Sequence, residues 1–214
     1  MRGKIIGVCL ICTMALCCMV ACDDAQSKDE KPTTTAQETT VENQTADKIV
    51  AIQVGEEDVY LDEVRYYAYS TQGTYEASYL TMGEEINWDG LMSGDATWEQ
   101  GVKSMVLDDI CKRECFYSMA DEYDVTLTKK EEKQIKSDVK TYYKDSNEKL
   151  MKKIDIGEES LARLFEKAAI AKKVESKAPE NAYDNWKKGH NITTTKEWDK
   201  ITFDQHIFTL EDLQ

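Results

Sequence analysis

Apolar side chains recur every three or four positions over residues 158–177, which is the clearest periodicity in the chain. Residues with this spacing share one face of an α-helix, and Pro179 stands where such a helix has to end. The pattern predicts an amphipathic helix with an apolar face made of Leu161, Leu164, Phe165, Ala168, Ala171 and Val174.

Two capping boxes predict where two further helices begin. Residues 97–100 and 128–131 each contain a Thr followed three positions later by Gln or Glu. In this arrangement the two side chains bond the first free backbone N–H groups of a helix. The apolar pattern adds one helix over residues 62–80 and a short one over residues 182–188. Residues 82–96 are predicted to form a loop, and their length makes them a candidate functional loop.

The two ends of this region are predicted to be strands. Residues 49–54 are rich in β-branched side chains, and residues 55–58 supply a turn. Residues 201–210 carry apolar side chains in a strand-like pattern, whereas residues 193–195 are predicted as loop. Pairing of the two strands would leave neither with an open edge. The predicted fold is mainly α with a small terminal β-strand pair, in one domain over residues 49–214.

The first 21 residues are typical of a secretory signal peptide. Arg2 and Lys4 precede an apolar run that is too short for a comfortable bilayer span. The run ends in a small residue, Ala21, followed by Cys22, which resembles a bacterial lipobox. That resemblance implies cleavage before Cys22 and a diacylglycerol on its thiol. Two alternatives stay open: an uncleaved membrane anchor, or cleavage after Ala21 without lipid.

Residues 22–48 are predicted to be a disordered acidic and Thr-rich tether. They contain almost no large apolar side chain. Such a segment does not bury enough surface to offset its chain entropy. The domain would therefore be connected to a membrane anchor through a long linker.

The net charge of the chain argues against one class of partner and favours another. The chain has 41 acidic and 27 basic residues, a formal net charge of −14, and loss of residues 1–21 removes two basic residues and makes it −16. Phosphate-binding surfaces need the opposite sign, which argues against nucleic acid as a partner. A charge of this size could instead steer a basic protein partner in a salt-dependent way.

Motifs for catalysis and for cofactor binding are missing from the sequence. It contains no nucleophile elbow, P-loop, Rossmann glycine pattern or paired-His metal motif, so we predict no cofactor and no metal site. Cys111 and Cys115 are four residues apart in a helical pattern and are predicted to be core-facing thiols, with a redox or metal role as the alternative. The acidic residues Asp121, Glu122 and Asp124 lack EF-hand spacing and are predicted to be a solvated helix end, with a calcium site as the alternative.

Several motifs, taken in order, resemble the PrsA/SurA-type foldases. The opening VAIQVGEE of residues 50–57 followed by Leu61-Asp62-Glu63 is similar to the family's VA-x-VNGE…LDEF start. Residues 120–132 resemble its A-x-E-x-G-x-x-x-T-x-E-E turn, and residues 156–161 resemble a later helix start. The resemblance implies a SurA N-terminal-like helical chaperone domain. It also implies a lipid-anchored extracytoplasmic protein that holds unfolded or secreted polypeptides.

The chain departs from the family in one respect that bears on activity. Many members carry a parvulin prolyl-isomerase domain of roughly 90 residues, and only about 14 residues follow Lys200 here. His206 faintly resembles the first histidine of a parvulin domain, but the other catalytic positions have no counterpart. We therefore expect no isomerase chemistry and no catalytic residue. Two alternatives remain: an interaction module for a dedicated protein partner, and a truncated parvulin-type isomerase.

Aromatic side chains are the predicted polypeptide contacts. The resemblance to the foldase family implies that unfolded chains bind weakly in an apolar crevice between helices. The candidate residues lie on the first predicted helix and in the loop after it, and a role in the core is the alternative reading. They are Tyr66, Tyr67, Tyr75, Tyr79 and Trp88.

Lipidation of Cys22 is directly testable. Mass spectrometry of the membrane fraction should show a mature chain that begins at Cys22 and carries the mass of a diacylglycerol. Cys22→Ser should accumulate as an unprocessed precursor, because the thiol is the acceptor of the lipid. Recovery of the wild-type protein from the medium with Ala21 still attached would contradict the prediction.

Overall fold

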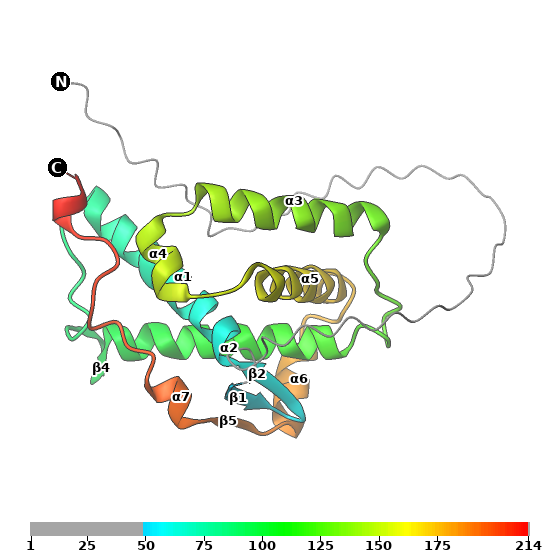
Figure 1. The fold of residues 1–214 in the computed structure, drawn as a ribbon. Coiled ribbons are helices and arrows are strands. Elements are labelled where there is room, and N and C mark those ends of the chain that lie inside the picture. Colours follow the sequence, from blue (N-terminus) through cyan, green and yellow to red (C-terminus); the bar gives the residue numbers. More distant parts are fainter. Residues whose placement is uncertain (1–48, 214) are drawn as a thin grey trace.

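The computed structural model describes residues 49–213 as a mainly helical domain with small antiparallel sheets. The predicted signal peptide, Cys22 and the predicted tether lie outside the described residues. Four long helices form most of the domain (Figure 1). They are α1 (Leu61–Thr81), α2 (Trp98–Ser118), α3 (Lys129–Asp145) and α5 (Glu158–Glu175).

Both predicted capping boxes are present and begin helices. The Thr97 side chain accepts the N–H of Gln100 at the start of α2, and the Gln100 side chain accepts the N–H of Thr97. Thr128 and Glu131 make the same reciprocal pair at the start of α3. The shorter helices are α4 (Glu148–Ile154), α6 (Ala182–Gly189), α7 (Lys196–Asp199) and the 3-10 turn η1 (Leu210–Leu213).

A three-stranded antiparallel sheet packs against the long helices. Its order is β2 (Glu57–Tyr60), β1 (Val50–Val54) and β5 (Ile192–Thr194), so the predicted first strand is central. Ala51, Ile52 and Val54 of β1 are buried in the core. The predicted loop over residues 82–96 contains a second, two-stranded hairpin of β3 (Leu91–Ser93) and β4 (Ala96–Thr97).

The predicted pairing of the two terminal strands is wrong. The strand that pairs with β1 on the side away from β2 is β5, although most of its residues were predicted to be loop. Residues 201–209 form no strand or helix. Their apolar side chains are nevertheless buried, with Ile201, Phe203 and Ile207 at most 4% exposed. The apolar pattern correctly indicated burial, but it did not reveal that side chains of α1 and α2 replace a neighbouring strand as hydrogen-bond partners.

Phe203 shows how strongly the irregular segment contributes to the core. Its side chain is fully buried, and its ring centroid lies 4.8 Å from that of Trp88. Phe203→Ala should lower the free energy of unfolding by about 3–5 kcal/mol, because it removes a buried ring and leaves a cavity. Urea denaturation checks this value. Leu213→Ala removes a side chain that is 52% exposed and should change stability by less than about 0.5 kcal/mol; equal effects of the two substitutions would contradict the prediction.

Candidate polypeptide-binding surface

The predicted aromatic contacts divide between two places. Tyr66 and Tyr67 lie near the start of α1, where Tyr66 contacts Tyr67, Tyr142 and Phe165 at centroid distances of 5.3, 5.6 and 6.1 Å. Burial raises the pKa of Tyr67 well above its usual range. Tyr66 therefore packs against α3 and α5, whereas the Tyr67 ring lies 4.8 Å from the guanidinium group of Arg113 on α2. Both tyrosines are far along α1 from the other predicted contacts.

Tyr75, Tyr79 and Trp88 lie together at the other end of α1, where they meet Trp98. The Trp98 ring is 6.0 Å from that of Tyr75 and 5.9 Å from that of Tyr79. Trp88 is only 4% exposed, and its indole N–H donates to Oε1 of Glu76 at 3.0 Å. Within this group, Trp88 thus belongs to the core, whereas the two tyrosines and Trp98 are half-buried.

The β3–β4 hairpin beside these rings exposes apolar side chains on both of its faces. Leu91 is 69% exposed and Met92 37% exposed. Met92 covers Gly101 of α2, and a Cβ atom at Gly101 would lie only 2.3 Å from the Met92 sulfur. Met105, one helical turn further along α2, is 41% exposed. We call this set the hairpin surface: Tyr75, Tyr79, Leu91, Met92, Trp98 and Met105.

Acidic residues are frequent in the part of the sequence that contains most of the hairpin surface. Residues 66–102 contain six acidic residues and no Lys or Arg. Four of the six are exposed: Glu84, Glu85, Asp89 and Asp95. Flexible Met and Leu side chains adapt to varied apolar partners, and the acidic charge of this part of the chain favours partners that also carry Lys or Arg. Two features of the sequence indicate the hairpin surface: the absence of Lys and Arg from residues 66–102, and the neighbouring Leu91 and Met92. The predicted contact residues were chosen without either feature.

A buried ion-pair cluster joins three helices on another part of the molecule. Lys167 of α5 donates to Glu114 of α2 at 2.7 Å and to Glu63 of α1 at 3.0 and 3.3 Å. Burial raises the pKa of Glu114 to about 7. Burial acts against the charge on Lys167, but the two facing carboxyl groups raise its pKa. The cluster satisfies its own members and therefore works as a link between helices.

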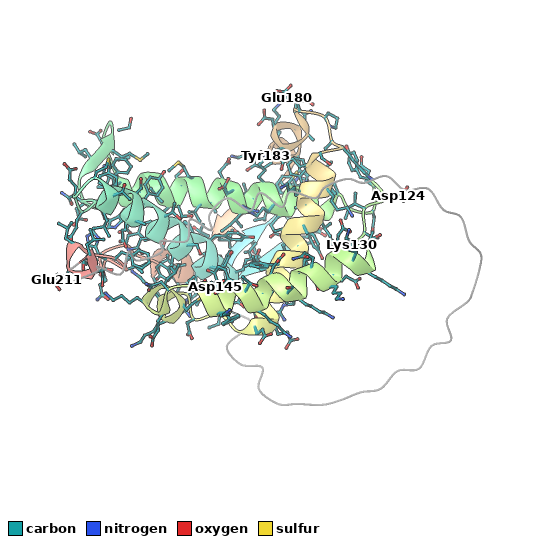
Figure 2. All side chains as sticks on the ribbon, turned by 90° about the horizontal axis from the view of Figure 1, so that it is seen from above. Asp124, Lys130, Asp145, Glu180, Tyr183 and Glu211 are labelled. Atoms are coloured by element: carbon teal, nitrogen blue, oxygen red, sulfur yellow. The ribbon has the colours of Figure 1, made fainter. Side chains whose placement is uncertain are left out.

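Two surface cavities are lined in part by charged side chains. One of about 270 Å³ lies beside the Lys167 cluster and includes Tyr117, Ser160 and Arg163. The other, of about 530 Å³, lies between α2, α5 and α6 and includes Glu180 and Tyr183, which Figure 2 labels at one edge of the molecule. Asp108 in this second cavity accepts hydrogen bonds from Tyr183 and Lys187. Its polar side chains are thus largely engaged with one another.

Cys111 and Cys115 are buried free thiols on α2, which confirms that they face the core. Burial raises the pKa of Cys111 to about 11 and that of Cys115 to about 12, so both stay protonated and poorly nucleophilic near neutral pH. Asp121, Glu122 and Asp124 are exposed in the turn after α2. Within residues 49–213, no three His, Cys, Asp or Glu side chains converge to hold a metal ion.

His206, the position compared with the parvulin histidine, lies in the irregular segment and is not on a strand. Its Nδ1 atom is 3.3 Å from Oε1 of Glu76. The His206 side chain is 27% exposed, whereas the carboxyl group of Glu76 is 1% exposed.

Comparison of the chain with protein-family models, with curated proteins and with solved structures gives no match. The resemblance to PrsA/SurA-type foldases therefore remains a prediction from the motifs in the sequence.

The raised pKa of Glu114 predicts a specific pH dependence of stability. Between its ordinary pKa of 4.5 and the folded value of about 7, the folded chain holds a proton that the unfolded chain releases. The free energy of unfolding should therefore fall as the pH rises through this window. In Glu114→Gln that fall should be smaller, as measured by urea denaturation across the window.

Asp109→Asn provides the matched control for this measurement, because it neutralises an exposed carboxyl group of the same helix. It should keep the wild-type pH dependence. A Glu114→Gln protein with the full wild-type fall in stability would contradict the assignment.

Proposed function

We propose that this protein is an extracytoplasmic, lipid-anchored, chaperone-like protein that holds unfolded or secreted polypeptides and performs no isomerase chemistry. The observation that carries the proposal is the hairpin surface, which presents exposed Leu and Met side chains beside half-buried aromatic rings. Apolar side chains gathered on a soluble surface with a polar rim are typical of polypeptide contact sites.

The chemistry of the hairpin surface suits unfolded chains in particular. An unfolded polypeptide exposes apolar side chains together with Lys and Arg, and the hairpin surface offers apolar contacts in a part of the chain that is rich in acidic residues. Met adapts its shape to different partners at little cost because its side chain is unbranched and flexible. Contacts of this kind are weak individually and tolerant of sequence, as holding many different chains requires.

The location in this proposal depends on the predicted lipid at Cys22. Within residues 49–213, none of the helices combines the length and the apolar character needed to cross a bilayer. The net charge of −16 expected after signal cleavage gives no attraction to an anionic lipid surface. In our proposal, the acyl chains therefore supply the attachment, and the acidic domain remains available to polypeptides.

The proposal is tested with the full chain in an aggregation assay. The protein at stoichiometric amounts should slow the aggregation of an unfolded, basic test protein. The double variant Leu91→Ser, Met105→Ser should lose most of this effect, because it removes the two most exposed apolar contacts among the Met and Leu residues of the hairpin surface. The loss should exceed about tenfold in the concentration needed.

The matched control is the double variant Leu91→Met, Met105→Leu, which keeps the surface apolar and should keep the activity. Equal activity of the Ser variant and the wild type would contradict the role of the hairpin surface. Capture of one stoichiometric partner from envelope extracts, without a mixture of unfolded chains, would favour the dedicated-partner alternative.

A further inference from the structure

The irregular segment of residues 201–213 is bound to the helices as a separate peptide would be. Outside η1 it belongs to no helix or strand, so its backbone groups need other partners. Side chains provide them. Glu99 accepts the N–H of Phe203 at 3.0 Å, and Glu85 accepts the N–H of Leu210 at 2.7 Å.

Glu76 is the central contact to this segment. Its Oε2 atom accepts the N–H groups of two successive residues, Ile207 at 2.8 Å and Phe208 at 2.9 Å. Its Oε1 atom is held by Gln72 at 2.7 Å and by Trp88 at 3.0 Å. Gln72 and Trp88 therefore orient the carboxyl group from outside the segment, and the other oxygen faces the bound backbone. Nδ1 of His206, which belongs to the segment, lies 3.3 Å from Oε1.

The carbonyl side of the segment is held in the same manner. The backbone carbonyl oxygen of Gln205 accepts hydrogen bonds from Nε2 of Gln72 at 3.0 Å and from Nζ of Lys153 at 2.6 Å. At the far end, Asp212 forms an ion pair with Lys149 of α4. Bonds to backbone groups do not depend on which side chains the bound segment carries, so this mode of recognition accepts many sequences.

Side-chain contacts add a preference for apolar residues at two positions. Ile207 is 4% exposed, and the Phe208 ring approaches α1 at Gly73. A Cβ atom at Gly73 would be 3.1 Å from Cε2 of Phe208, so the glycine allows the ring to approach the helix. We call this set the docking face: Gln72, Gly73, Glu76, Lys149 and Lys153.

We propose that the docking face is a binding site for a bent polypeptide segment, and that residues 205–212 of the same chain occupy it in this structure. The partner that it fits is a polypeptide segment with two successive free N–H groups, an apolar–aromatic pair at those residues, and an acidic residue four positions after the aromatic one. These requirements are the properties of residues 207, 208 and 212 in the bound segment. It differs from the hairpin surface, which is acidic and selects basic chains.

A consequence of this arrangement is competition between the chain's own segment and an external one. A covalently linked segment acts at an effective concentration in the millimolar range, so an external peptide should bind the wild-type chain weakly. Loosening the internal segment without altering the docking face should reveal the site. Residues 207, 208 and 212 can be changed for this purpose, because they belong to the bound segment only.

The experiment measures fluorescence anisotropy of a labelled peptide with the sequence of residues 203–213. The full chain carrying Ile207→Ser and Phe208→Ser should bind this peptide about tenfold or more tightly than the wild type does. Circular dichroism and thermal unfolding establish that the variant is folded. Asp212→Lys, which alters only the ion pair at the far end and its local turn, gives a second, milder route and should raise the affinity about threefold.

A chemically matched peptide separates backbone recognition from general adhesion of apolar residues. Methylation of the backbone nitrogens of Ile207 and Phe208 removes both N–H donors to Glu76 and keeps every side chain. This peptide should bind the loosened variants about tenfold or more weakly than the unmodified one. Equal binding of the two peptides, or equal affinity of the wild type and both loosened variants, would overturn the proposal. The result is independent of the aggregation assay, so a failure of either proposal is recognisable as such.

Discussion

The described structure depends most on the buried carboxyl group of Glu76, which is 1% exposed. Its two oxygens accept from Gln72 on the same helix, from Trp88 in the segment after that helix, and from the backbone of Ile207 and Phe208. One side chain thus joins α1 and the segment that follows it to residues 207 and 208, which are 131 and 132 residues after Glu76 in the sequence. A buried polar group that loses a partner costs about 1–3 kcal/mol, so these segments hold each other in one arrangement.

Charged and polar anchors of this kind compensate for limited apolar contact between the helices. The buried face of α3 consists of only Ile135, Val139 and Tyr142. The Lys167 cluster ties α1, α2 and α5 together, and Lys173 of α5 bonds Glu131 at the start of α3. Because a buried charge without a partner is strongly unfavourable, removal of one member of such a pair would destabilise the contact between these helices.

The two proposed polypeptide sites both depend on the end of the domain that Glu76 organises. Glu76 holds Trp88 in the core, and the β3–β4 hairpin follows directly after it, which carries Leu91 and Met92 to the surface. The other oxygen of the same carboxyl group accepts the backbone N–H groups of residues 207 and 208. The two proposed sites are therefore connected through the buried carboxyl group of Glu76.

The sequence by itself determined the four long helices and α6, because capping boxes and apolar periodicity are local properties, whereas the short helices α4 and α7 were not predicted. Thr97 with Gln100 and Thr128 with Glu131 predicted two helix starts, and the face from Leu161 to Val174 is buried as expected. The strand of residues 50–54 and the buried Cys111 and Cys115 were also predictable. Only the tertiary structure decided the partner of that strand, the division of the aromatic residues between two sites, and the irregular path of residues 201–209. Each of these depends on which distant side chain meets a backbone group or ring, and neither local pattern nor composition contains that information.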